Sequence, residues 1–320
     1  MHEISTLDRA PAASLPNRPP LSSYGWFGAL PFILCHVAIL GAFWSGVTLE
    51  SVLLCVGLLA LRTWGVTAGY HRYFAHRTYK TGRVFQFLLA LLAQTSSQKG
   101  ALWWAAHHRV HHRKSDEEGD VHSPVQNGFF YSHVGWIFAD TEETRWEQIR
   151  DFAKYPELRF LNRYYLLPPI LLGVACFLWM GYPGLFIGFF LSTVLCWHNT
   201  FLVNSLAHVV GTRRFETTDQ SRNNWFIAIC TLGEGWHNNH HHYPGSARNG
   251  FYWWEIDVTY YGLLALERLG IVWDLRAPPL RVLEAGRESD RQRAARRARF
   301  AAPEPIVAEP VALPVAIDPS

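Results

Sequence analysis

The chain has 320 residues and is rich in aromatic and poor in charged side chains. Charged residues make up 17%, against roughly 25% in soluble proteins, and aromatic residues make up 15%. An apolar fraction of 49% excludes a disordered protein, and a net charge of +3 is too small for a surface that follows nucleic-acid phosphates. The five cysteines form no CxxC pair, which excludes a disulfide scaffold, a cysteine-based zinc ribbon and an iron–sulfur site.

The first 22 residues are polar and proline-rich and lack the apolar core of a signal peptide, so we expect a loose tail. Four nearly uncharged apolar runs follow, each long enough, or almost long enough, to span a membrane. The spacers within the first pair and within the second pair are short, which predicts two helical hairpins. The runs are Tyr24–Trp44, Ser51–Gly69, Tyr164–Met180 and Gly184–Val203.

The positive charges predict the orientation of these runs. Residues 70–163 and 204–300 are rich in Arg and Lys, whereas the hairpin turns carry none, so we expect both blocks and both termini on the cytoplasmic side. Arg62 is the charge that interrupts a run, and it either snorkels to the interface or faces the protein interior. The sequence therefore predicts an all-α, multi-pass membrane protein with four transmembrane helices and a cytosolic helical cap. A soluble protein with four buried helices is the alternative, which the length of the uncharged runs disfavours.

Composition also suggests three parts: the tail 1–22, a membrane domain 23–275 and a C-terminal tail 276–320. The C-terminal tail is first basic and then rich in Pro and Ala, and we expect it to be disordered. Its basic part, residues 281–299, also suits a solvated or membrane-surface helix.

Sixteen histidines stand out, and thirteen of them lie in the polar blocks that follow apolar runs. On a helix, positions i, i+3 and i+4 share one face, so two of the clusters are each expected to project together. A third cluster has an i, i+5 spacing, about 140° apart on an ideal helix, so it either straddles a centre or spans a helix end. Asn204 and His208 form a further i, i+4 pair. The three clusters are His71/His76, His108/His111/His112 and His237/His240/His241.

Imidazole is a good nitrogen ligand for iron, zinc, copper and nickel, and crowded imidazoles without a metal repel one another when protonated. The eight clustered histidines and His208 exceed the capacity of one ion, and two ions with four to five nitrogens each fit the count. We interpret His36 and His198 as ordinary core histidines. His107 and His242 adjoin the clusters but fall outside their spacing, which indicates outer-shell or surface positions.

With these clusters in view, the sequence resembles the membrane-bound fatty-acid desaturases, specifically the stearoyl-CoA (delta-9) type. The likeness covers about residues 25–275, and the order and spacing of its motifs match. It implies a di-iron centre held by the nine histidines, with Asn204 bound through a water, and recombinant protein can carry zinc in place of iron. The motifs are Gly65–Tyr79, Gly128–Trp136, Leu202–His208 and Gly233–His241.

The resemblance also implies a bent tunnel beside the metals in which a long saturated acyl chain receives a cis double bond at carbon 9. The residues that bend the tunnel correspond to Gln98, Trp104 and Thr200, and by analogy Cys55 and Leu59 cap its end. Two positions depart from the family's CoA-binding pattern: Ala106–His107 replaces an Arg–Asp pair, and Lys99 replaces an Asn. The substrate is therefore an acyl-CoA held by other basic groups or an acyl chain on a phospholipid.

Acidic residues near the clusters are the next candidates. Carboxylates normally orient ligating imidazoles, and Glu234 and Asp120 are placed to do so, with ordinary surface acids as the alternative. We interpret the acidic run Asp116–Asp120 as a solvated loop. The chain has no dinucleotide, haem or iron–sulfur motif, so a ferredoxin or cytochrome b5-like donor fed by an NAD(P)H reductase is implied. The candidate docking residues for that donor are Arg72, Arg109, Arg113 and Lys114.

Two other functions remain open from the sequence. A di-iron hydroxylase of alkyl or lipid chains would use the same ligands and return a hydroxyl group. A zinc-binding or metal-transporting membrane protein is less consistent with spans that carry almost no polar ligands. The motif contexts favour the desaturase.

Overall fold

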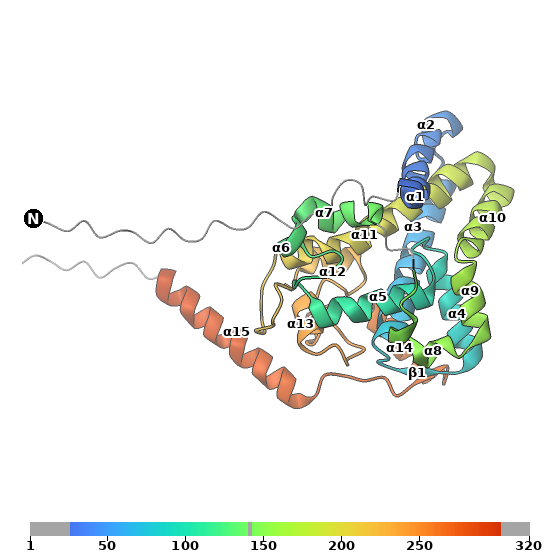
Figure 1. The fold of residues 1–320 in the computed structure, drawn as a ribbon. Coiled ribbons are helices and arrows are strands. Elements are labelled where there is room, and N and C mark those ends of the chain that lie inside the picture. Colours follow the sequence, from blue (N-terminus) through green and yellow to red (C-terminus); the bar gives the residue numbers. More distant parts are fainter. Residues whose placement is uncertain (1–25, 140–142, 302–320) are drawn as a thin grey trace, which may run out of the picture.

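The computed structural model describes residues 26–139 and 143–301, and the predicted N-terminal tail lies outside them. The described chain is mostly helical, with a single two-stranded sheet (Figure 1). In chain order the helices and strands are α1 (Trp26–Ala38), α2 (Gly41–Ser45), α3 (Leu49–Trp64), the π-helix η2 (Gly65–Ala75), β1 (Lys80–Thr81), α4 (Arg83–Gln94), α5 (Ala101–Lys114), α6 (Pro124–Asn127), α7 (Phe129–His133), the 3-10 helices η3 (Gly135–Phe138) and η4 (Trp146–Gln148), α8 (Arg150–Ala153), α9 (Pro156–Arg163), α10 (Leu167–Pro183), the π-helix η5 (Gly184–Leu191), α11 (Ser192–Asn204), the 3-10 helix η6 (Leu206–His208), α12 (Trp225–Cys230), α13 (His237–His242), α14 (Val258–Arg268), β2 (Val272–Trp273) and α15 (Leu280–Ala301).

All four apolar runs are helical where the structure describes them. Two continuous helices are long and apolar enough to cross a membrane, Leu49–Ala75 and Leu167–His208, and Ala29–Ser45 is a shorter apolar helix. The second of these is 42 residues long, about 63 Å at 1.5 Å per residue, which is twice the thickness of a hydrocarbon core. Its helical backbone is interrupted at Gly181, where φ is +60° and ψ is −146°. This break lies in the predicted turn between the third and fourth runs, and α10 packs back against η5.

The first hairpin closes by side-chain capping. Thr48 is the N-cap of α3: its hydroxyl accepts from the Ser51 backbone N–H, and the Ser51 hydroxyl accepts from the Thr48 N–H, both at 3.1 Å. This reciprocal pair satisfies two helix-end donors and fixes where the chain re-enters the apolar layer. The second hairpin uses a glycine in a left-handed conformation and Pro183, which lacks a backbone N–H, to stop one helix and start the next.

Arg62 faces the protein interior and is fully buried, so the snorkelling alternative is wrong. Its guanidinium donates to the Thr193 hydroxyl at 2.6 Å, to the Ser192 hydroxyl, and to the carbonyls of Thr95 and Phe189. These acceptors belong to the η5–α11 junction and the end of α4. Arg62 therefore joins α3 to two other helices through neutral oxygens, which satisfies a charge that burial alone would penalise.

The polar blocks fold into a helical cap beside the apolar helices. Its largest core cluster joins η2, α4, α5, α8, α9 and α14, and a short antiparallel ladder pairs Lys80 with Trp273 and Thr81 with Val272. Figure 1 shows α13 next to one end of α5 in this cap. The clustered histidines lie on α5 and α13 and on two further segments, η2 and η6, each of which directly follows an apolar helix.

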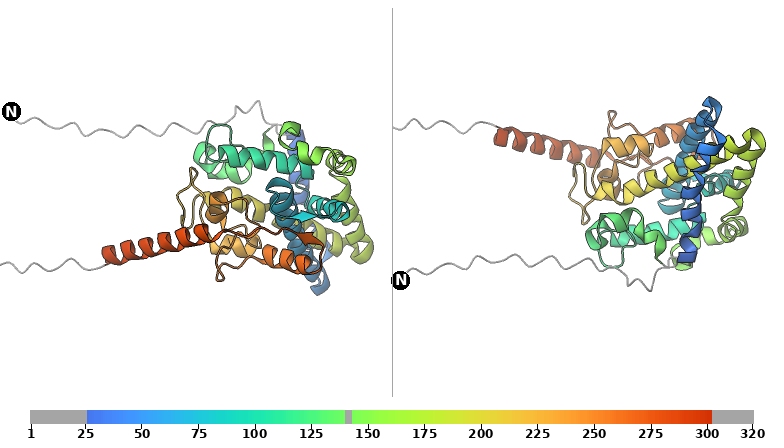
Figure 2. Two further views of the ribbon diagram at one scale, coloured as in Figure 1. Left: turned by 90° about the horizontal axis from the view of Figure 1, so that it is seen from below. Right: turned by 90° about the horizontal axis from the view of Figure 1, so that it is seen from above.

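The C-terminal segment is helical from Leu280 to Ala301, which agrees with the interpretation of residues 281–299 as a helix, and residues 302–320 lie outside the described chain. The first half of α15 packs on the cap: Asp290 pairs with Arg214 at 3.0 Å, and the Ser289 hydroxyl donates to the Arg214 carbonyl. Both views of Figure 2 show the second half projecting from the body. This half carries the basic residues that the sequence singled out.

Replacing Arg62 with Leu is expected to lower the free energy of unfolding by about 1–3 kcal/mol, because buried oxygens lose their donor. The matched control is Arg83→Leu, which removes an exposed ion pair with Glu157 and should cost less than about 1 kcal/mol. Thermal unfolding in detergent micelles compares the two. Equal stability of the two variants would contradict the cross-linking role of Arg62.

Candidate metal centre

The i, i+5 histidine pair is explained by a π-helical turn. The backbone N–H of His76 bonds to the carbonyl of His71 at 3.1 Å, an i→i+5 hydrogen bond at the end of η2. This winding brings residues five apart to one side, and the two imidazole centroids lie 4.7 Å apart. The 140° separation expected on an ideal α-helix does not apply here.

The nine predicted histidines gather into two adjoining groups, one of five rings and one of four. In each group, one nitrogen per ring lies within 4.8 Å of the corresponding nitrogens of the other rings. Helices α5 and α13 each contribute histidines to both groups. Neighbouring positions on one helix face point in slightly different directions, so a single helix can supply both groups. The first group is His71, His76, His108, His112 and His240, and the second is His111, His208, His237 and His241.

The glycines of the 233–241 motif allow the segment before α13 to pack tightly against α12 and Asp257. A Cβ on Gly235 would lie 2.0 Å from the Ala228 backbone nitrogen, and one on Gly233 would lie 2.4 Å from Asp257 Oδ1. The two asparagines of the motif then hold this six-residue helix. Asn238 Oδ1 accepts from the backbone N–H groups of residues 214 and 215 at 2.8 Å, and Asn239 accepts from Asn223 Nδ2 at 2.7 Å. No pattern in the sequence indicated this anchoring role.

Four carboxylates face the outer nitrogens of four clustered imidazoles. Glu234 lies 2.8 Å from His71 Nδ1, and Asp120 lies 2.9 Å from His111 Nδ1, as the sequence led us to expect. Two further pairs were not predicted: Asp116 with His208 at 2.9 Å, and Asp219 with His241 at 2.6 Å. The interpretation of residues 116–120 as a solvated loop is wrong for Asp116 and Asp120, whose side chains are almost fully covered, and holds for Glu117 and Glu118. Asp219 lies in a loop with no spacing to a histidine that could have revealed it.

These pairings fix the tautomers. A carboxylate that takes the Nδ1–H of a neutral imidazole leaves Nε2 as an unprotonated lone pair. Contacts between Nε2 atoms run at 3.0 Å from His71 to His240 and from His208 to His237, and His241 Nε2 is buried without a hydrogen-bond partner. Lone pairs that converge at this distance fit a cation between them, and neutral nitrogen donors suit a divalent transition metal.

The electrostatics favour neutral rings in the interior of the groups. Burial, reinforced by neighbouring imidazoles, holds the pKa of five rings well below the ordinary value: His76, His108, His112, His237 and His240. Asp120 has the opposite effect at the rim: although burial opposes it, this carboxylate raises the pKa of His111. Burial alone would raise the pKa of both Asp120 and Glu234. The adjacent His111 outweighs burial at Asp120, and His71 and Arg72 outweigh it at Glu234, so both pKa values lie below the ordinary range.

The remaining residues that the sequence singled out are Asn204 and four histidines outside the two groups. Asn204 ends α11 beside the second group, where its carbonyl accepts from the Ser132 hydroxyl, and its role as a water-mediated ligand stays a prediction. His107 and His242 lie outside both groups, stacked on Trp103 and Phe215. His36 and His198 bond to each other at 3.1 Å.

Two of the proposed docking arginines are structural. Arg72 is buried and bonds to Glu234 at 2.9 Å and to Asp257 at 2.9 Å. Arg109 holds Asp151 at 3.0 Å and donates to the carbonyls of Phe74 and Ala75. Neither is available to a partner protein, so this part of the docking hypothesis is wrong, whereas Arg113 and Lys114 are exposed.

With this geometry in place, comparison with known proteins is decisive. The sequence profile of the family described as fatty acid desaturase matches residues 48–263. The chain belongs to the fatty acid desaturase family. Similar proteins include the "sn-2 palmitoyl-lipid 9-desaturase" of Nostoc sp. (strain 36), 37% identical over 235 residues that cover 70% of this chain and 82% of the relative. The "Acyl-CoA 5-desaturase AL21" of Anemone leveillei is 37% identical over 74% of this chain and 72% of its own, and the "sn-1 stearoyl-lipid 9-desaturase" of Anabaena variabilis is 34% identical over 78% and 93%.

The desaturase has an apolar cavity of about 820 Å³ next to the first histidine group. Gln98 and Trp104 line it, Trp104 stacks on His108 with ring centroids 4.7 Å apart, and Gln98 donates to the Thr200 hydroxyl at 3.0 Å. Cys55 and Leu59 are not among its wall residues. Gln98 and Trp104 therefore line the cavity, and Thr200 is bonded to Gln98; their role in bending a tunnel, and that of Cys55 and Leu59 in capping it, stay predictions.

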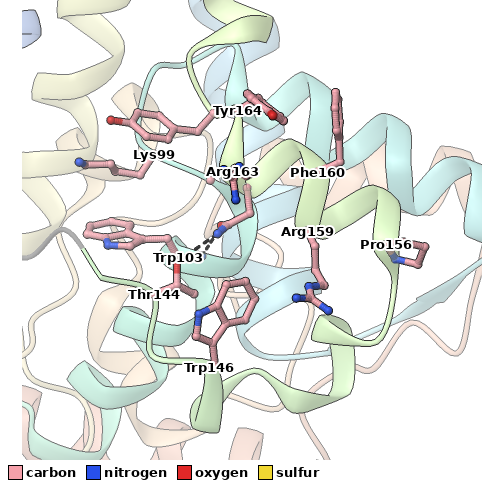
Figure 3. Close-up of a pocket in the computed structure, with 12 residues that line it drawn as sticks. Lys99, Trp103, Thr144, Trp146, Pro156, Arg159, Phe160, Arg163 and Tyr164 are labelled. Carbon is pink, nitrogen blue, oxygen red and sulfur yellow. Dashed lines mark hydrogen bonds between the residues drawn. The ribbon is translucent and has the colours of Figure 1, made fainter.

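A second cavity of about 530 Å³ adjoins the first and is cationic (Figure 3). Arg159 and Arg163 extend into it from α9, with the Arg159 guanidinium 5.8 Å from the centroid of a Trp146 ring. Lys99, Trp103 and Tyr165 line both cavities. No sequence motif pointed to the two arginines.

Replacing Asp219 with Asn is expected to weaken metal binding by about 10–100-fold, because the imidazole of His241 loses the carboxylate that fixes its tautomer. The control is Asp274→Asn, which breaks an exposed pair with Lys80. Iron per chain, measured by mass spectrometry after dialysis against graded chelator, gives the comparison. Equal iron retention in the two variants would contradict the role assigned to Asp219.

The metal-free protein is expected to lose stability as the pH falls from about 7.5 to 5.5. Unfolded histidines take up protons near pH 6.5, whereas the five buried rings with lowered pKa do not, so the unfolded state binds more protons and is favoured in acid. His111, whose pKa is raised, contributes in the opposite direction but is outnumbered. The carboxylates respond only near pH 4 and below, outside this window. Thermal unfolding of chelator-treated protein across the window provides the check, and a melting temperature that rises toward acid would overturn it.

Proposed function

We propose that the chain is an O₂-dependent di-iron desaturase that inserts a cis double bond, at carbon 9, into a long saturated fatty acyl chain. The observation that carries the proposal is the contact of Trp104 with both the apolar cavity and His108 of the five-nitrogen group. An unactivated methylene is inert to acids and bases, so a metal oxidant beside a hydrocarbon channel is the chemistry that these residues suit. The family membership supports desaturation, and the two cyanobacterial relatives, both named as 9-desaturases, support position 9.

Iron bound by the nine histidines would supply the O₂-derived oxidant for hydrogen abstraction. The residues of the chain position the substrate and exclude water from the reacting carbons. Trp104 forms a rigid wall between His108 and the cavity, and the Gln98–Thr200 pair places a polar contact where the chain passes. Holding a methylene pair within a few ångström of the oxidant replaces any need for a side-chain nucleophile. A bend enforced at these three residues favours a cis product.

We propose four membrane spans in two hairpins, with both termini and the histidines on the cytoplasmic side. The break at Gly181 supports two spans within the 42-residue apolar helix, and the capped turn before α3 supports a hairpin of α1–α2 with α3. Large exposed apolar side chains on these helices, such as Leu53, Val56, Leu178 and Trp179, suit contact with lipid. The Arg and Lys residues of the cap support its cytoplasmic orientation.

The cationic cavity supports an anionic head group on the substrate, either CoA or a lipid phosphate. Arg159 and Arg163 supply planar donors for phosphate oxygens, and the three residues shared with the apolar cavity place that head at the mouth of the acyl site. Electrons come from an acidic ferredoxin or cytochrome b5-like protein. Arg113 and Lys114 at the end of α5 are exposed basic residues that follow His112 in sequence and suit its docking.

Expression in a host without an aerobic desaturase, together with a compatible electron donor, is expected to yield a new cis-monounsaturated fatty acid with its double bond at carbon 9. His111→Ala removes a nitrogen of the second group and should abolish the product, whereas His242→Ala, on α13 but outside both groups, should retain it. Gas chromatography–mass spectrometry with double-bond derivatisation measures both.

A hydroxy fatty acid in place of the alkene would favour the hydroxylase alternative. Absence of any new product, with iron and donor confirmed in the cells, would overturn the enzyme proposal and favour a metal-binding protein.

A further inference from the structure

Part of the wall of the apolar cavity is also part of the outer surface of the membrane helices. Ile170 and Val174 on α10 line the cavity, yet their side chains are 57% and 49% exposed. Pro31 on α1 lines it as well and is exposed. Since α1 and α10 are apolar helices that we assign to the bilayer, the cavity opens there at the depth of hydrocarbon rather than toward water.

The opposite side of α1 is closed. Phe32 stacks on Trp197 of α11 with centroids 5.4 Å apart and an interplanar angle of 25°. His36 Nε2 bonds to His198 Nε2 at 3.1 Å, and His198 Nδ1 bonds to His133 Nε2 at 3.0 Å, which ties α1 through α11 to α7. These polar and aromatic contacts hold α1 against α11, so the opening of the cavity lies on the side of α1 that faces α10.

The three histidines of this tie are not a further metal site. His198 uses its two nitrogens in opposite directions, toward His36 and toward His133, whereas a metal requires nitrogens that converge. Their role is to fix one edge of the opening. A polar chain of this kind within an apolar layer is a strong interhelical contact because water does not compete for its hydrogen bonds.

The opening and the cationic cavity together define an amphipathic ligand. One end of the apolar cavity meets the arginine-lined cavity at Lys99, Trp103 and Tyr165, and its flank opens between α1 and α10. A water-soluble carrier needs an opening to the cytosol only. A bilayer lipid keeps its second chain in the membrane and needs an opening at membrane depth, next to a site for its phosphate.

We propose that the acyl site is loaded sideways from the bilayer, between α1 and α10, by a glycerophospholipid whose phosphate binds at Arg159 and Arg163. This inference rests on the proposed function, since it names the acyl carrier for that site. One acyl chain passes Val174 and Ile170 to reach Trp104, while the other remains among the lipids.

The experiment measures loading, without turnover. The protein is placed in nanodiscs that contain a phosphatidylglycerol with a diazirine near the methyl end of one acyl chain, and photoadducts are located by mass spectrometry. Trp197 and Phe201 line the cavity and are buried, so adducts there report entry, and adducts on exposed Leu53 of α3 serve as the internal reference.

Val174→Trp fills the opening and is expected to lower the inner adducts, relative to Leu53, by about tenfold. Leu178→Trp, one turn further along α10 on a surface that does not line the cavity, is the matched control and should leave them unchanged. Ile170→Trp is the second plug if Val174→Trp unfolds. Equal inner labelling in plug and control, or labelling of the cavity only by a diazirine palmitoyl-CoA irrespective of the plug, would overturn sideways loading by a lipid.

The two proposals fail in different ways. If the inner residues are labelled and the plug blocks them, but the wild-type chain forms no unsaturated product, the loading route stands and desaturation does not. If the wild-type chain desaturates while the plug leaves both labelling and product unchanged, only the route is wrong.

Discussion

The structure depends on bringing nine imidazoles together in one buried region. Burial lowers the pKa of the inner rings, such as His108 and His240. Three carboxylates accept an Nδ1–H at the rim, and the fourth, Glu234, lies 2.8 Å from His71 Nδ1, which leaves the Nε2 lone pairs directed inward. The carboxylates are themselves held: Glu234 by Arg72, and Asp116 by the Ser123 hydroxyl and the Gln220 backbone N–H at 2.7 Å. The loops between α5 and α6 and between η6 and α12 are therefore held in place by the histidine groups, because each loop carries a carboxylate that contacts a histidine ring on another helix.

Departures from α-helical winding deliver the remaining geometry. The π-helical η2 brings His71 and His76 together, and it continues directly from the apolar helix α3, so the placement of α3 determines the placement of these two histidines. The π-helical η5 lies at the start of α11, where Arg62 bonds to the Phe189 carbonyl and to the hydroxyls of Ser192 and Thr193. Arg62 thus connects α3, which leads to His71, with α11, which leads to His208. The segments that carry His71 and His208 therefore keep a constant position relative to each other, because the buried Arg62 guanidinium links the helices that lead to them.

Local spacing was enough to group six of the nine histidines, since i, i+3 and i+4 positions share a helix face whatever the surrounding fold, whereas the His71/His76 pair depends on the π-helical turn of η2. It was not enough for Asp219 or Asp116, whose partners lie 22 and 92 residues away, nor for Arg159 and Arg163, which gain meaning only beside Lys99 and Trp103. The charges near the motifs also led to a wrong prediction. Arg72 and Arg109 were expected to be surface cations, but each pairs with a carboxylate inside the cap. Cys55 and Leu59, which analogy suggested as the cap of the tunnel, are not among the residues that line the cavity, and their role stays a prediction.

The walls of the acyl site differ in how many polar contacts hold them. Helix α3 is fixed by a guanidinium with several acceptors, and α11 is fixed by both that guanidinium and the Trp197 indole N–H, which donates to the Ser96 carbonyl at 2.7 Å. Helix α1 is tied to α11 by one imidazole and one aromatic stack, and its contacts with the α10 side of the cavity are apolar. Apolar contacts between helices are matched by lipid tails in a bilayer, so separating them costs little. The walls of the cavity next to the histidines are held by polar contacts, and its apolar wall faces lipid. An acyl chain can therefore enter without disturbing the nine histidines.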